Sequence, residues 1–266
     1  MKKNVDYKNE ALAALKGNWS SAVLAVLVFT IVDAIVIGPN LYSSLGLVND
    51  PTNPFLTNHQ NGFSALSFIL EVLVLFPLTV GLYNAFKNLL VKGDDQLVKG
   101  IFGIGFGRYR RNAAASLLKY IFTFLWTLLL IVPGIIKLLS YSMTNYILED
   151  EPSLSPNKAI DLSCEMMKGH KFDLFYLYLS FIGWAVLCLF TLGIGFLWLE
   201  PYVLTAQASF YQDVKGDYIA RKTLAAAGAA NAVAPAPVAE ETTEASAEVP
   251  AIKDVRTENP EDYMPR

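Results

Sequence analysis

Cysteine and charged side chains are scarce in this chain, and each scarcity excludes a class of protein. Two cysteines among 266 residues are too few for a disulfide framework. Charged residues make up 17% of the chain, against about a quarter in typical soluble domains. The net charge of −3 is close to neutral and does not indicate a nucleic acid partner.

Hydrophobic residues are abundant instead, at 53% of the chain, and they are grouped in long runs between blocks of charge. Apolar runs of about 18 residues or more are typical of transmembrane helices. The sequence therefore predicts an all-α, polytopic transmembrane helical bundle with the lipid bilayer as its main partner. The six predicted spans cover residues 19–37, 63–86, 114–132, 134–150, 172–191 and 196–212.

The stretch 119–152 organises this layout. Its apolar run is interrupted at Pro133 and Gly134, the candidate helix break, and it ends at the acidic residues 149–151. We read it as two spans that meet at a Pro-Gly corner. Lys119 lies near the start of the third predicted span, and its long side chain is expected to reach the membrane interface from there. The alternative is one kinked helix over 116–148, which would change the number of crossings.

Residues 155–169 have an amphipathic pattern. Ser155 is a suitable N-cap and Pro156 suits the first helical position. Polar residues recur at spacings of three and four, with Ala, Ile and Met on the opposite stripe. The pattern predicts an interfacial helix that lies flat on the membrane.

The distribution of basic residues predicts the orientation. With six spans and a cytoplasmic N-terminus, 20 of the 21 Lys and Arg residues fall on the cytoplasmic side, the exception being Lys137. This asymmetry is the one that the positive-inside rule describes. Both termini are therefore predicted to be cytoplasmic, because a five-span layout would move Lys215, Arg221 and Lys222 outside.

The last part of the chain has a different composition. Residues 223–266 are rich in Ala, Pro and Glu and show no hydrophobic periodicity, which is typical of a disordered segment. The predicted organisation is a transmembrane domain over 1–222 and an acidic cytoplasmic tail over 223–266, through which a soluble protein could bind.

Three stretches carry a resemblance to a known family: LWTLLLIVPGIIKLLSYSM, MMKGHKFDLFYLYLSFIGW and FTLGIGFLWLEPY. They resemble a family of bacterial integral membrane proteins known only as a domain of unknown function, the nine-seven-five family. The resemblance covers residues 7–217. It implies a bacterial cytoplasmic (inner) membrane location and a helical bundle, and it implies no activity and no catalytic residues.

Four ionisable residues fall inside predicted spans, namely Asp33, Glu71, Lys137 and Glu200. Each charge costs about 2.5–3.5 kcal/mol at the centre of a bilayer on insertion scales, so such residues need a partner or a function. By position along their spans, all four fall in the outer half of the bilayer, where three carboxylates would surround one ammonium. Two interpretations stay open: an ion or proton site, or structural pairing with interfacial placement.

Motifs of soluble enzymes are missing. The glycines at 100–107 precede Arg108, Arg110 and Arg111 without the Lys-Ser/Thr of a phosphate-binding loop, so we expect these arginines to contact lipid headgroups. The only histidines, His59 and His170, are predicted on opposite faces of the membrane, which excludes a shared histidine metal site. No cofactor, no metal and no catalytic site is predicted.

These observations favour a non-enzymatic scaffold or accessory component of the membrane. The alternative is a small transporter or lipid-handling protein that uses the charge cluster. The two differ in one structural feature: a cavity that reaches Glu71 favours transport or lipid handling, and tight packing with paired charges favours a scaffold.

Overall fold

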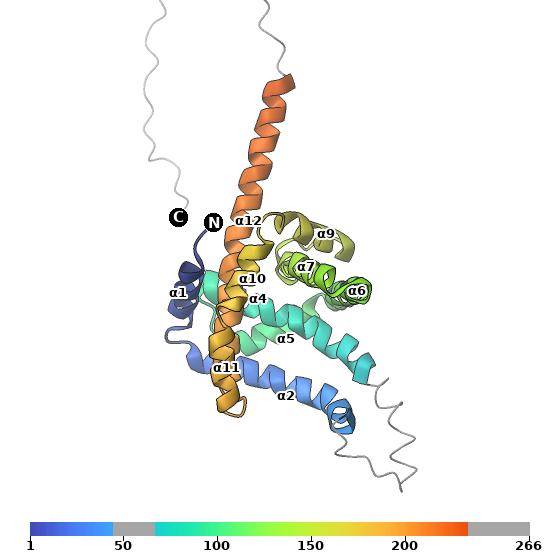
Figure 1. Cartoon of the computed structure of the whole chain (residues 1–266), viewed down its shortest axis with the longest axis vertical. Coiled ribbons are helices and arrows are strands. Elements are labelled where there is room, and N and C mark those ends of the chain that lie inside the picture. Colours follow the sequence, from blue (N-terminus) through green and yellow to red (C-terminus); the bar gives the residue numbers. More distant parts are fainter. Residues whose placement is uncertain (45–66, 234–266) are drawn as a thin grey trace, which may run out of the picture. The chain divides into compact units, whose positions relative to one another are not determined.

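A computed structural model of the chain describes residues 1–44 and 67–233, and every regular element in these ranges is a helix (Figure 1). The chain divides into two units, Met1–Leu224 and Ala225–Arg266. The helices, in chain order, are α1 (Asn4–Leu15), α2 (Trp19–Ser44), the π-helical turn η1 (Glu71–Leu75), α4 (Phe76–Lys92), α5 (Leu97–Gly107), α6 (Tyr109–Leu129), α7 (Ile131–Tyr141), α8 (Thr144–Asp150), α9 (Pro156–Met166), α10 (Lys171–Leu179), α11 (Ile182–Phe190) and α12 (Phe196–Val233).

Four of the described helical stretches are long and apolar enough to cross a membrane: Trp19–Val36, Ser67–Lys92, Tyr109–Leu129 and Lys171–Phe190. They correspond to the first, second, third and fifth predicted spans. The predicted fourth span is divided between α7 and α8, which are 11 and 7 residues long. The predicted sixth span lies within α12, where polar residues such as Glu200 and Gln207 interrupt the apolar run.

Helix α4 is the centre of the packing. Leu78 and Leu82 on one side of α4 belong to a core with α2 and α5. Val80 faces a second core that α1, α8, α9, α10 and α12 also build. A π-helical turn precedes Pro77, whose ring cannot supply a backbone N–H to the turn before it, so the helix is irregular at this point.

Helices α6, α7 and α8 form an antiparallel hairpin. Arg108 pairs with Glu149 at the open end of the hairpin, and Lys119 contacts Asn145 in its middle. Near the tip the two helices approach so closely that a Cβ added to Gly134 would lie 2.9 Å from the Cα of Thr127. The chain reverses at Leu130, which has an extended backbone between the two helices. A single kinked helix over 116–148 is therefore wrong, and Gly134 is needed because α6 leaves no room for a side chain there.

Helix α9 begins where the sequence predicted, with Ser155 at the N-cap position and Pro156 at the start of the helix. Its apolar stripe, Ala159, Ile160 and Met166, is buried, and α9 packs against α6, α7 and α8. Protein contacts thus cover the stripe that the amphipathic pattern assigned to the membrane surface. Periodicity reports only that one face is apolar, and does not distinguish a lipid surface from another helix.

Helix α12 continues through residues 223–233, the first part of the segment that the sequence assigned to the tail. These residues are mainly alanine, which has the highest helix propensity. The rest of the predicted tail, 234–266, and His59 lie outside the described residues.

Candidate functional site

One face of α4 separates two cavities. Phe76, Thr79 and Tyr83 follow one another at spacings of three and four, so their side chains lie on the same side of the helix. All three residues line both cavities. We call these the Lys119 cavity and the carboxylate cavity, after the ionisable residues that line each.

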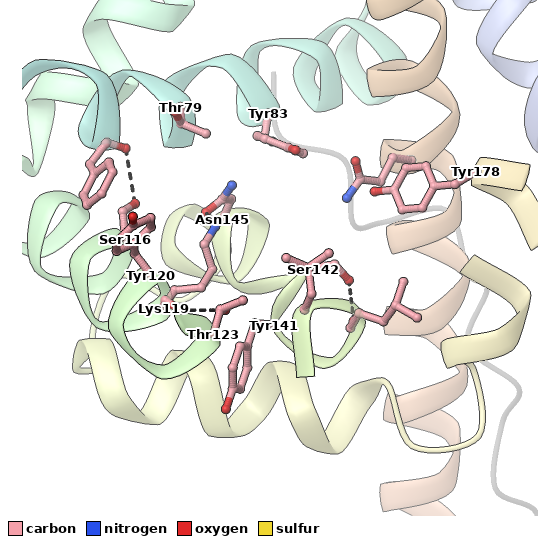
Figure 2. A pocket seen from close by; sticks show the side chains of 14 residues that line it. Thr79, Tyr83, Ser116, Lys119, Tyr120, Thr123, Tyr141, Ser142, Asn145 and Tyr178 are labelled. Carbon is pink, nitrogen blue, oxygen red and sulfur yellow. Dashed lines mark hydrogen bonds between the residues drawn. The ribbon is translucent and has the colours of Figure 1, made fainter. Parts of the chain in front are cut away.

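The Lys119 cavity has a volume of about 330 Å³, which is in the range of small-molecule sites. Side chains of α4, α6 and α8 reach toward the same space (Figure 2). The lining is rich in hydroxyl groups and contains no aspartate or glutamate. It consists of Phe76, Thr79, Tyr83, Ser116, Lys119, Tyr120, Thr123, Leu138, Leu139, Tyr141, Ser142, Asn145, Tyr178 and Gln207.

Lys119 is the middle residue of the candidate span Tyr109–Leu129. Its ammonium Nζ donates a hydrogen bond to Asn145 Oδ1 at 2.9 Å. Asn145 is itself held in place, because its backbone carbonyl accepts a hydrogen bond from Asn84 Nδ2 at 2.7 Å. The side chain therefore points into the protein, and the expectation that Lys119 reaches the interface from a span end is wrong. The helix begins five residues earlier than the predicted span, which moves the lysine toward its centre.

The carboxylate cavity has a volume of about 320 Å³ and is lined by Asp33 of α2, Glu71 of η1 and Glu200 of α12, together with seven other residues. Three of the four residues predicted to form the charge cluster are thus close to one cavity. Lys137 is not among its lining residues: its Nζ lies 4.7 Å from the centre of the Trp126 ring, between α7 and α6. Position along a span fixes the depth of a side chain but not the direction in which the helix turns it.

A metal site is not formed by these carboxylates. Within the part of the chain that the structure describes, no group of three or more His, Cys, Asp or Glu side chains is placed to hold a metal ion. His170 instead pairs with aspartates: its Nε2 lies 3.0 Å from Asp217 Oδ2, and Arg221 Nε lies 2.8 Å from the same oxygen. The hydrogen bond from His170 has the largest effect on the pKa of Asp217 and lowers it; burial opposes this effect, and the charge of Arg221 adds to the lowering.

The arginines at the start of the hairpin have protein partners. Arg108 Nη1 lies 3.2 Å from Glu149 Oε2, and Arg111 Nη1 donates to the backbone carbonyls of Glu151 and Pro152. Arg110 is exposed. Two of the three arginines thus close the base of the hairpin, and their contact with lipid headgroups stays a prediction.

Asp150 is the centre of an ion-pair network that the sequence did not indicate. Its carboxylate pairs with Lys87 of α4 and with Lys215 of α12, whose Nζ lies at 2.5 Å, and accepts a hydrogen bond from the Tyr211 hydroxyl at 2.8 Å. The Lys87 side chain is only 6% exposed. In the sequence, Asp150 is visible only as part of the acidic end of an apolar run, and this pattern does not identify the residues that pair with it.

A second set of contacts fastens α1 to α12. The Tyr7 hydroxyl donates to Asp213 Oδ2 at 2.6 Å, and the backbone N–H of Lys2 donates to the same oxygen at 2.8 Å. Burial raises the pKa of the Asp213 carboxyl, but these two hydrogen bonds, together with the charges of the N-terminus and Lys2, lower the pKa overall. Ser209 Oγ also donates to Glu10 Oε2 at 2.5 Å.

Comparison with known proteins gives one match. A family model described as a protein of unknown function (DUF975) matches residues 41–217, which include Glu71, Lys119, Asp150 and Glu200 but not Asp33. The resemblance seen in the sequence is thereby confirmed, over a range that begins later than residue 7. No curated protein and no solved structure matches the chain.

Proposed function

This chain belongs to the DUF975 family, whose function is unknown, and we propose that it is a membrane protein that binds and handles an amphiphilic molecule such as a lipid. The observation that carries the proposal is the Lys119 cavity, which places an ammonium in the middle of a candidate membrane span. A charge at that depth costs about 2.5–3.5 kcal/mol unless it is compensated. A ligand with a polar head and apolar chains supplies the compensation and suits the surrounding lipid.

The two cavities favour this function over a scaffold. A scaffold would gain most from tight packing and paired charges, and the ion pairs of Asp150 have that character. The carboxylate cavity, however, reaches Glu71 and holds about 320 Å³ of space, which is the feature that favours transport or lipid handling. Recruitment of a soluble protein by the predicted tail, residues 223–266, stays a separate prediction.

A lipid is expected to copurify with the full chain in mild detergent and to appear in native mass spectra as a stoichiometric adduct. Thr79 lines both cavities, so Thr79→Phe fills space in each and is expected to lower lipid retention about tenfold, the equivalent of about 1.4 kcal/mol. Ser20→Phe is the matched control, because Ser20 lies exposed on α2 and lines neither cavity. Equal lipid retention by Thr79→Phe and the wild type would contradict the proposal.

We further propose six crossings of the bacterial cytoplasmic membrane with both termini inside. The positive-inside asymmetry supports this layout, as does the Asp150 network. Lys87, Asp150 and Lys215 belong to the ends of the second, fourth and sixth predicted spans. Their direct contact is what is expected if these ends lie at one membrane face.

The orientation can be tested by cysteine labelling in a chain whose Cys164 and Cys188 are replaced by serine. A cysteine at Gly216 is expected to react with a membrane-impermeant maleimide only after the cells are opened. A cysteine at Asn53, in the predicted outer loop, is the control and is expected to react in intact cells. Labelling of the Gly216→Cys chain in intact cells would overturn the six-span layout.

A further inference from the structure

We infer that the Lys119 cavity binds the monoanionic phosphodiester head group of a lipid, an inference that rests on the proposed function and names the class of its ligand. An ammonium has three N–H donors. Among the residues that the structure describes, Asn145 accepts one of these bonds, and no carboxylate lines the cavity. Lys119 therefore has two donors and one positive charge available for a ligand.

Other donors converge on the same space. Tyr83, Tyr120 and Tyr178 line the cavity, and their hydroxyls make no hydrogen bond with other atoms of residues 1–36 and 67–227. The hydroxyls of Thr79, Ser116 and Ser142 are instead donated to backbone carbonyls. The available polar groups thus include three phenols beside the ammonium, an arrangement that matches an oxygen-rich anion.

The charge of the cavity selects the class of anion. Within residues 1–44 and 67–233, Lys119 is the only cation that lines the cavity, so one negative charge is neutralised. A phosphomonoester carries about −1.5 to −2 at pH 7 and would leave a buried negative charge, whereas a phosphodiester carries one. A volume of about 330 Å³ lies at the lower end of the range of small-molecule sites. That space suits a phosphate with its glycerol and is too large for a carboxylate alone.

The rim of the cavity suits the remainder of a lipid. Tyr120 is 48% exposed and Leu138 is 56% exposed, and both line the cavity. Ile121, Phe124 and Ile135 are exposed apolar neighbours on the same two helices of the hairpin. A head group held at Lys119 would thus leave its acyl chains against an apolar surface that the bilayer already covers.

The test uses the full chain in mild detergent, with phosphatidylglycerol, dioleoylglycerol and inorganic phosphate as separate probes. We expect Lys119→Met to lower the retention of phosphatidylglycerol by roughly tenfold to a hundredfold, as for a lost hydrogen bond between charged groups. Retention of dioleoylglycerol, which has no phosphate, is expected to change little. Lys119→Arg keeps the charge and is expected to retain most of the binding. Lys137→Met is the matched control, because it removes the other lysine of the hairpin away from the cavity.

The outcomes separate the inference from the proposed function. Equal retention of phosphatidylglycerol by Lys119→Met and Lys137→Met would overturn the inference, although a lipid bound elsewhere would still support lipid handling. Inorganic phosphate is the second comparison. If it raises the melting temperature of the wild type as much as phosphatidylglycerol does, the site binds a soluble anion, and the inference that its ligand is a lipid is overturned. If Lys119→Met fails to fold, Tyr178→Phe is the second variant, because it removes one available donor at nearly constant volume. Unchanged binding of phosphatidylglycerol by Tyr178→Phe would overturn the inference.

Discussion

Replacement of Gly81 by alanine is expected to disrupt the packing of α4 against α5 and to lower the yield of folded protein sharply. A Cβ at Gly81 would lie 1.9 Å from the carbonyl oxygen of Ile101 and 2.8 Å from its carbonyl carbon. The contact is reciprocal, because a Cβ at Gly105 would lie 2.8 Å from the carbonyl oxygen of Pro77. These are backbone atoms of a neighbouring helix, so one whole helix has to move (Figure 1).

The expected cost of Gly81→Ala is about 3 kcal/mol or more, at the upper end of the range for overpacked cores. This loss of stability is measured by thermal unfolding in detergent, with the fraction of protein that stays monodisperse as the signal. Gly103→Ala is the matched control on α5, because no atom lies within 4 Å of a Cβ at that position. The control is expected to be neutral or stabilised by up to about 1 kcal/mol, since alanine favours a helix over glycine. An unchanged melting temperature for Gly81→Ala would contradict the close approach of the two helices.

Replacement of Asp150 by asparagine is expected to destabilise the fold by about 3–5 kcal/mol, the usual cost of removing one partner from a buried ion pair. The substitution keeps the size of the side chain and removes its charge. Lys87, with 6% of its side chain exposed, is then left without its counter-charge, and Lys215 loses the same partner. The measurement is again the shift of the thermal unfolding transition.

Two further variants isolate the electrostatic cause. Glu149→Gln removes the neighbouring carboxylate, whose pair with Arg108 is 34% and 44% exposed, and this change is expected to cost less than about 1 kcal/mol. Combining Asp150→Asn with Lys87→Met removes both buried charges and is expected to recover part of the loss. The interpretation is wrong if Asp150→Asn and Glu149→Gln shift the transition equally.

The lysines of the hairpin explain why part of the candidate site was predictable and part was not. A charged residue in an apolar run is visible in the sequence, and for this reason Asp33, Glu71, Lys137 and Glu200 can be named from the sequence alone. Their grouping was argued from depth alone, and Lys137 in fact lies over Trp126. Lys119 was assigned to a span end because the predicted span began five residues late, and the Lys119 cavity was missed with it.

The reversal of the chain between 116 and 150 was left open by the sequence, against one kinked helix, and the structure decided it. The sequence by itself determined the all-helical class and four stretches that suit a bilayer. These properties follow from local composition and periodicity, which act along the chain. Only the tertiary structure decided which carboxylate meets which lysine, which stripe of α9 is covered by protein, and where space is left beside α4. Such properties depend on how each helix is rotated about its own axis, and contacts between residues distant in the chain set that rotation.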